Sequence, residues 1–315
     1  MTPSNVRLVF MGSPAFAVPS LRALVAAGYN VVAVMSQPDR PAGRGAKVHE
    51  PEVKIAALDL GIEVFQPETL RDESVRERMA AFDADVFVVA AYGKILPRAV
   101  LATPRRGCVN VHASLLPRWR GASPINAAIL AGDEETGVSI MELEFKMDAG
   151  PVIARSAIPI APDDTTATLE PRLAELGART LGEVLPHWCE REVAAMPQDE
   201  SLATYCSLLK KEDGHLKLEM TATEAERATR AYNPWPGAFV QYRGERLAIW
   251  AAHVAEVADR KPAGSLMVIE KCPAVTFSGG ALVLDEVQRA GSRRLPGEQF
   301  MNGERGELPP TVGLA

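Results

Sequence analysis

The chain has no arrangement of cysteines that suggests a metal site or a disulfide framework. Its four cysteines, Cys108, Cys189, Cys206 and Cys272, are scattered without a CxxC pair or Cys/His ligand spacing. No apolar run is long enough to cross a bilayer, and no basic stretch followed by an apolar one opens the chain. We therefore expect a protein of the reducing cytoplasm, without a metal ion, a signal peptide or a membrane partner.

Excess positive charge is also missing. The 315 residues carry a net charge of −6, so the surface as a whole does not suit nucleic acid, although a local basic patch still can. The sequence lacks the GxGxxG fingerprint of dinucleotide-binding folds and the GxSxG turn of serine hydrolases. These absences disfavour a nicotinamide-dependent oxidoreductase or nucleotide sensor and a serine nucleophile.

Apolar residues make up 47% of the chain, which is enough for the cores of two domains. In the first half, helical patterns separate apolar runs that we interpret as strands at residues 6–10, 31–35, 62–65, 85–91, 109–112 and 137–143. Strands that alternate with helices predict a parallel α/β sheet. A helical pattern over residues 169–189 closes this half.

The pattern of apolar and polar residues changes after residue 190. A polar segment without a firm period follows, and then short apolar runs with close turns, at residues 239–242, 247–251, 265–269, 274–277 and 281–287. Such runs predict a small β-barrel or sandwich. We therefore expect one domain at residues 1–190, a linker at 191–206 and a second domain at 207–315.

The stretch NVHASLLPRWRG, residues 110–121, places polar groups directly after an apolar strand. Each unpaired polar group that is buried costs roughly 2 kcal/mol or more, so the stretch is either a polar surface loop or a site. Strand alternation puts Asn110 and His112 on one face. Two hydrogen-bond donors at the end of a strand suit a developing oxyanion; a structural histidine and a capping asparagine are the alternatives.

Asp148 follows the strand predicted at 137–143 and precedes a glycine turn. A turn-forming aspartate is the simpler interpretation. The functional interpretation is a carboxylate that orients His112 or relays its proton. Sequence spacing alone does not show whether the two side chains meet.

The loop QPDRPAGRGAK, residues 37–47, carries Arg40, Arg44 and Lys47 at the carboxyl end of the second predicted strand. Ligands bind at that edge of open α/β sheets, and the three cations suit phosphates. A solvated surface loop has the same composition. Its glycine and proline content predicts that residues 40–48 are mobile.

Taken together, N-x-H-x-S-L-L-P-x-x-R-G and the later M-D-x-G resemble the folate-dependent formyltransferase family. The stretches MGSPAFA, QPDRPAGRG, AYGKILP, GDEETGVSIM and RAYNPWPGAF extend the similarity, over nearly the whole chain, to its members that act on methionyl-tRNA. The resemblance implies a Rossmann-like α/β domain with a mostly parallel sheet, followed by a small OB-like β-barrel that binds tRNA. It implies a transferase that moves the formyl group of 10-formyltetrahydrofolate to the α-amino group of methionine on initiator tRNA, for translation initiation.

The resemblance also assigns residues. Asn110, His112 and Asp148 match the catalytic residues of the family. The folate-binding positions that it implies are Ser114, Leu115, Leu116, Pro117, Tyr92, Gly93, Ile95 and Leu96. Arg40, Arg44 and Lys47 fall in the loop that engages the tRNA acceptor stem. The chain departs from the family pattern at Lys217 and Leu218, which stand where Asp and Trp are usual. We expect the protein to be a monomer.

The main rival is a formyltransferase that acts on an amino-sugar nucleotide with the same folate donor. It shares the Asn/His/Asp residues and a second domain, but generally lacks the basic RPAGRG loop. A purine-pathway formyltransferase would end near residue 200, so the second half of the chain argues against it.

Overall fold

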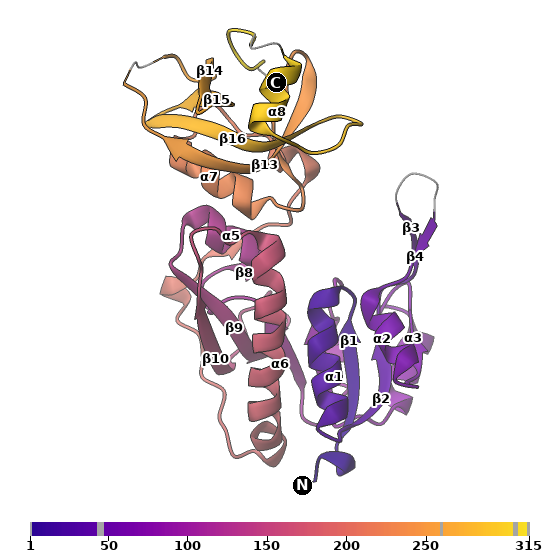
Figure 1. The fold of residues 1–315 in the computed structure, drawn as a ribbon. Helices are drawn as coiled ribbons and strands as arrows, with labels where there is room; N and C mark the ends of the chain where they lie inside the picture. Colours follow the sequence, from indigo (N-terminus) through magenta and orange to yellow (C-terminus); the bar gives the residue numbers. More distant parts are fainter. Residues whose placement is uncertain (1, 43–46, 259–260, 305–307, 314–315) are drawn as a thin grey trace. The chain divides into compact units, whose positions relative to one another are not determined.

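The computed structural model describes residues 2–42, 47–258, 261–304 and 308–313 (Figure 1). Its internal contacts divide the chain into two units of three segments each. The first unit comprises Met1–Pro124, Glu135–Pro159 and Glu170–Cys206, and the second comprises Ile125–Glu134, Ile160–Leu169 and Ser207–Ala315. By contacts, therefore, residues 191–206 belong to the first unit, and two short segments before residue 190 belong to the second.

The first unit contains a sheet of seven strands. They are β1 (Arg7–Gly12), β2 (Asn30–Met35), β5 (Val64–Phe65), β6 (Val86–Ala90), β7 (Cys108–His112), β9 (Glu135–Glu142) and β10 (Val152–Pro159). Their order is β10-β9-β7-β6-β1-β2-β5. The strands from β7 to β5 are parallel, whereas β9 and β10 pair antiparallel. The expected mostly parallel α/β sheet is thus confirmed.

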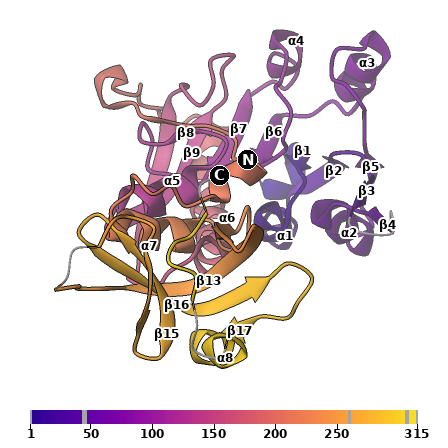
Figure 2. The ribbon, with the colours of Figure 1, turned by 90° about the horizontal axis from the view of Figure 1, so that it is seen from above.

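Helices cover both faces of this sheet (Figure 2). One face carries α3 (Glu73–Ala81) and α4 (Arg98–Leu101), which share a buried core with Phe87, Val89 and Cys108. The other face carries α1 (Val18–Ala26), α2 (Glu52–Asp59) and α6 (Thr166–Glu190), with the short turns η1 (Pro3–Asn5) and η2 (Ala15–Ala17) nearby in sequence. Because both faces are covered, every residue of β6 and β7 is buried, which accounts for the unbroken apolar character of β6, whereas β7 carries Asn110 and His112 among its apolar residues.

The segment 191–206, predicted as a linker, packs along the first unit. It contains the turn η3 (Glu200–Leu202) and the short strand β11 (Tyr205–Cys206), which pairs in parallel with β8 (Arg120–Gly121). Met196 exchanges two backbone hydrogen bonds of 2.8 Å with Val152 of β10. The backbone of this segment is therefore hydrogen-bonded to the first unit.

The loop predicted at residues 37–47 contains most of a β-hairpin. Its strands are β3 (Arg40–Ala42) and β4 (Lys47–His49). Lys54 of α2 joins the two ends of the hairpin, because its Nζ lies 2.5 Å from Asp39 Oδ2 and 2.6 Å from Glu50 Oε1. The tip, residues 43–46, lies outside the described residues, and the mobility expected for residues 40–48 stays a prediction.

The second unit is built on an antiparallel sheet, as expected. Its strands are β12 (Ala238–Tyr242), β13 (Glu245–Ala255), β14 (Leu266–Ile269), β15 (Cys272–Phe277), β16 (Gly280–Arg289) and β17 (Leu295–Pro296). The order is β12-β13-β16-β15-β14, with β17 beside β16. The helices of this unit are α5 (Pro124–Ala131), α7 (Ala222–Ala231) and α8 (Gly297–Gly303), with the turn η4 (Lys211–Gly214).

Residues 310–313 join the two edges of this second sheet. At the β14 edge, the Leu266 amide donates to the Pro310 carbonyl oxygen at 3.0 Å. At the β12 edge, the Gly313 amide donates to the Gln241 carbonyl oxygen at 2.9 Å. Since both edges are bonded to one segment, the sheet is closed in the manner of a small barrel. Among the helices of the described ranges, none combines the length and apolar character needed to cross a membrane.

Candidate active site

Strand β7 places Asn110 and His112 on one face of the sheet. Val111, between them, faces α6, since a Cβ on Gly177 of that helix would lie 2.7 Å from the Val111 side chain. Asn110 and His112 therefore point to the opposite face, and they are only 8% and 6% exposed. In the described part of the chain, no hydrogen bond involves the Asn110 side chain, whose register neighbours are Val89 and Met141. The amide is left open to a bound molecule.

His112 and Asp148 meet, a point that the spacing in the sequence left open. The imidazole Nε2 lies 3.0 Å from the carbonyl oxygen of Trp119. Because a carbonyl oxygen only accepts, Nε2 carries a hydrogen in this arrangement. The other ring nitrogen, Nδ1, lies 3.8 Å from Oδ2 of Asp148. A second proton on the imidazole would thus sit on Nδ1, facing the carboxylate.

The loop that ends in β8 supplies the other contacts of this pair. The Gly121 amide donates to Oδ2 of Asp148 at 2.9 Å, and Asp148 itself has φ +47° at the turn after β9. Gly121 has φ +121°, and a Cβ there would lie 2.0 Å from the carbonyl oxygen of Cys206 in β11. Only glycine fits this position, because of both the backbone conformation and the close approach.

Arg120, Gly121 and Gln198 are parts of this arrangement to which the sequence analysis gave no individual role. Arg120 is fully buried, and Gln198 accepts from its guanidinium at 2.9 and 3.0 Å. Gln198 was assigned to a linker from its polar surroundings. The two arginines in PRWRG were the available signal. A buried arginine needs polar partners, so a buried loop with this sequence requires partners from elsewhere in the chain.

The stretch 114–117 follows β7 and lines the same face. The Ser114 hydroxyl donates to the Arg118 carbonyl oxygen at 2.6 Å. Leu116 is buried with Met141 and Val152, while Leu115 and Pro117 are half-buried. Leu116 therefore belongs to the core beneath this face, and Leu115 is the leucine of this stretch that remains partly exposed.

The second predicted folate segment, 92–96, belongs to the core between the sheet and α3 and α4. Tyr92 and Leu96 are buried there, whereas Ile95 is 77% exposed and Gly93 turns the chain with φ +79°. Leu143 packs against this core and against the Leu116 cluster, so the two segments adjoin. The Tyr92 hydroxyl has no partner among the described residues, and burial raises its pKa to about 12.

The three predicted tRNA-binding residues belong to the hairpin. Arg40 is exposed in β3, and Lys47 begins β4. Arg44 falls in the tip, outside the described residues. The hairpin follows β2, at the carboxyl edge of the sheet, where β7 also ends.

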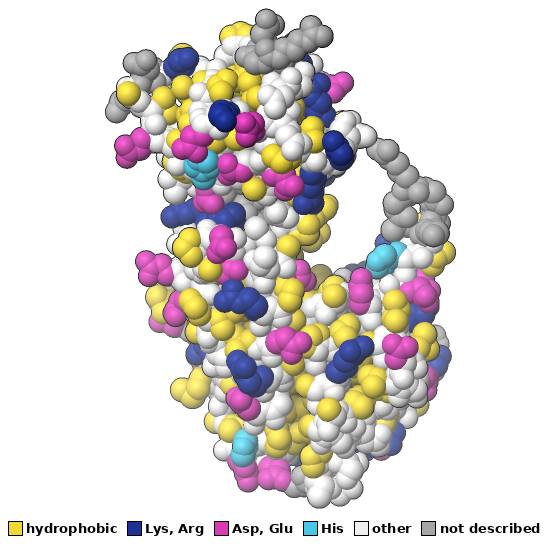
Figure 3. All heavy atoms as spheres, in the orientation of Figure 1, with side chains coloured by type: hydrophobic (Ala, Val, Ile, Leu, Met, Phe, Trp, Pro, Cys, Tyr) yellow, Lys and Arg dark blue, Asp and Glu magenta, His cyan; other side chains and the backbone are white. Residues whose placement is uncertain are grey.

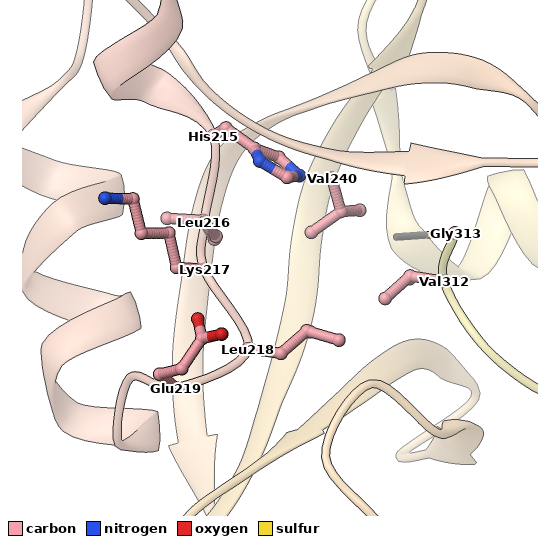
Figure 4. A pocket seen from close by; sticks show the side chains of 8 residues that line it. All are labelled: His215, Leu216, Lys217, Leu218, Glu219, Val240, Val312 and Gly313. Carbon is pink, nitrogen blue, oxygen red and sulfur yellow. The ribbon is translucent and has the colours of Figure 1, made fainter. Parts of the chain in front are cut away.

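A pocket of about 250 Å³ lies in the second unit and contains none of the predicted catalytic residues (Figure 4). It is lined by His215, Leu216, Lys217, Leu218, Glu219, Val240, Val312 and Gly313. His215 is stacked on Phe239, with ring centroids 5.0 Å apart. Val312 and Gly313 belong to the segment that joins the two edges of the second sheet, so the pocket lies beside that closure. Within the described ranges, no cluster of three or more His, Cys, Asp or Glu side chains is placed to hold a metal ion.

Comparisons with known proteins agree on one family. Residues 6–185 match the model of the formyl transferase family, and residues 208–305 match that of the formyl transferase C-terminal domain. The chain is 48% identical over 297 residues to the methionyl-tRNA formyltransferase of Methylococcus capsulatus, covering 94% of this chain and 96% of that protein. It is also 48% identical over 299 residues to that of Dechloromonas aromatica, covering 95% and 96%. Among solved structures, an N-formyltransferase from Helicobacter canadensis, in complex with folinic acid and dTDP-3-aminofucose, has a TM-score of 0.67 at 17% identity and covers 90% of this chain and 99% of that one.

Proposed function

The chain belongs to the formyl transferase family, and from that premise we propose that it transfers the formyl group of 10-formyltetrahydrofolate to the α-amino group of methionine on initiator tRNA. The product, formylmethionyl-tRNA, serves translation initiation. The observation that carries the site assignment is the nearly buried pair Asn110 and His112 at the end of β7, with Oδ2 of Asp148 3.8 Å from Nδ1 of the imidazole.

In the proposed reaction, the neutral amine attacks the formyl carbon and negative charge develops on the formyl oxygen. Asn110 donates to that oxygen, and its unpaired amide supports this role. Donors preorganised in a site with little water stabilise such charge strongly. The reaction needs no covalent enzyme intermediate, because the amine is itself the nucleophile.

His112 and Asp148 are proposed to handle the proton of the attacking amine. Trp119 fixes the imidazole with a hydrogen on Nε2, so Nδ1 is the atom that gains and loses a proton. Once both nitrogens are protonated, Nδ1–H donates to the formyl oxygen or to the leaving folate nitrogen. Asp148 stabilises the charged imidazolium from 3.8 Å.

The folate is proposed to lie along residues 114–117 and 92–96. The partly exposed Leu115 and the exposed Ile95 offer apolar contact for the pterin and its linker. Ligand sites commonly combine such apolar walls with a few polar groups that fix orientation. Here Asn110 and the backbone of the Ser114 loop supply those groups.

The tRNA is proposed to contact the hairpin and a cationic face of the second unit. Arg40, Arg44 and Lys47 would pair with phosphates of the acceptor stem. In the second unit, two hollows of about 130 and 270 Å³ share Arg246 and Arg289. Lys and Arg side chains gather along one edge of that unit (Figure 3). Arg294 lies 3.4 Å from the Trp250 ring centroid, an arrangement that suits a phosphate beside a base.

The proposal is tested by following labelled formyl from 10-formyltetrahydrofolate to methionine-charged initiator tRNA, with wild type and Arg44→Ala. We expect transfer by wild type and a sharp loss in the variant at unchanged folate affinity. Transfer to an amino-sugar nucleotide instead of tRNA would support the rival function, which keeps Asn110, His112 and Asp148 in the same roles.

A further inference from the structure

Gln198, in the segment 191–206, bonds directly to the backbone of the Asp148 loop. Gln198 donates from Nε2 to the carbonyl oxygens of Asp148, at 2.8 Å, and Gly150, at 2.7 Å. Its Oε1 accepts from Nε and one terminal nitrogen of Arg120 at 3.0 and 2.9 Å. Carbonyl groups only accept and a guanidinium only donates, so this orientation of the amide is the only one that satisfies all four contacts.

Arg120 ties the same amide to the loop that faces the catalytic pair. It lies between Trp119, whose carbonyl oxygen bonds His112, and Gly121, whose amide bonds Asp148. Its side chain is fully buried, with Glu200 at 3.0 Å and the Tyr205 hydroxyl at 3.3 Å as further partners. A buried guanidinium without its partners would draw in water and release the loop.

We propose that Gln198 is a positioning residue that sets the distance between Asp148 and His112. The Gln198 amide bonds the backbone of the Asp148 turn through its Nε2 and the Trp119–Gly121 loop through the Arg120 side chain. The Asp148 backbone has φ +47°, a conformation that persists only where its surroundings impose it. The inference rests on the proposed formyl transfer for its kinetic consequences, while the geometry stands without it.

Two variants separate the contacts of Gln198. Gln198→Glu still accepts from Arg120 but has no N–H for the two carbonyl oxygens. Gln198→Met keeps the length of the side chain and loses both sets of contacts. Tyr205→Phe is the matched control, because it removes only the 3.3 Å contact to Arg120 and leaves the Asp148 loop bonded.

The variants are compared in formyl transfer to methionyl-tRNA, with kcat measured across pH and scaled to folded enzyme. We expect kcat to fall about 100-fold in both Gln198 variants with the KM for folate little changed, since misplacement by about 1 Å has that effect. A merely structural Gln198 would lower stability and leave kcat and its pH profile unchanged, as Tyr205→Phe should.

A crystal structure of Gln198→Met distinguishes failure of this inference from failure of the proposed function. Displacement of Asp148 from the Gly121 amide supports the positioning role even if wild type transfers no formyl group to tRNA. An Asp148 that still accepts from Gly121 in the variant overturns the inference, whatever the substrate of the enzyme is.

Discussion

Replacing Gly121 by alanine should lower both the stability of the first unit and kcat, and the magnitude of each effect follows from the contacts of Gly121. The new Cβ would lie 2.0 Å from the Cys206 carbonyl oxygen, whereas carbon and oxygen pack at roughly 3.5 Å. One of the strands β8 and β11 must therefore move by on the order of 1 Å. That movement strains the hydrogen bonds that Arg120 and Ala122 donate to this segment, at 2.9 and 3.2 Å.

The expected loss of stability combines two causes. An alanine at φ +121° costs about 1–3 kcal/mol, and each backbone hydrogen bond that is lost costs about 1 kcal/mol. We expect the free energy of opening of the first unit to fall by about 2–4 kcal/mol. Because the Gly121 amide moves away from Asp148, kcat should fall about 100-fold as well.

Gly28→Ala is the matched control. Gly28 has φ +81°, but a Cβ there would meet nothing within 4 Å, so it measures the cost of backbone strain without a clash, about 1 kcal/mol. Native-state hydrogen exchange reads the opening free energy of amides in β6 and β7 separately from those of the second unit. If Gly121→Ala kept the wild-type rate, or if Gly28→Ala lost as much stability, the argument from the Cys206 contact would be refuted.

Four further predictions follow from the contacts described. Asn110→Ala and His112→Ala should keep the circular dichroism spectrum of wild type, and loss of the Asn110 donor should lower kcat about 100-fold, or about 3 kcal/mol of barrier; unfolded variants would instead indicate a structural role. Lys54→Met should raise the KM for tRNA and not that for folate, because it frees both ends of the hairpin; equal KM values would show that the hairpin does not touch tRNA. The Arg120 and Lys146 side chains hold the pKa of Glu200 at about 2, below its ordinary 4.5. A carboxylate with a lowered pKa stabilises the fold at pH values above its ordinary pKa and loses that effect as the pH falls. The stability advantage of wild type over Glu200→Gln in urea unfolding should therefore be full at pH 7 and shrink as the pH falls from 4.5 to 2. Burial raises the pKa of Cys108 to about 12, so iodoacetamide at pH 8 should leave this thiol unmodified until the protein unfolds, as mass spectrometry of the peptides will show.

The elements that the sequence predicts well are those whose signal is local. β6 is a continuous apolar run because it is buried on both faces, and α6 was predicted at 169–189 against Thr166–Glu190 in the structure. β10 was missed, because its alternating burial pattern belongs to an edge strand with one face open. β3 and β4 were missed because glycine and proline dominate that segment.

The candidate site divides in the same way. Asn110 and His112 follow from the alternation of one strand, and their resemblance to a family motif gave them roles. The 3.8 Å approach of Asp148 to His112 depends on the pairing of β7 with β9, which local patterns do not encode. Gln198 and Arg120 are 78 residues apart in the chain, and the two-residue strands that bring them together have no periodicity to detect.

The burial of Arg120 has a consequence for the order of folding. Its partners come from a segment 78 to 85 residues further along the chain, so the guanidinium stays hydrated until that segment docks. Loops closed over such a separation form late, because the entropy of closure has to be met first. We therefore expect refolding enzyme to regain its helical and sheet signals before its activity, with the interval set by the docking of a few residues onto the finished sheet.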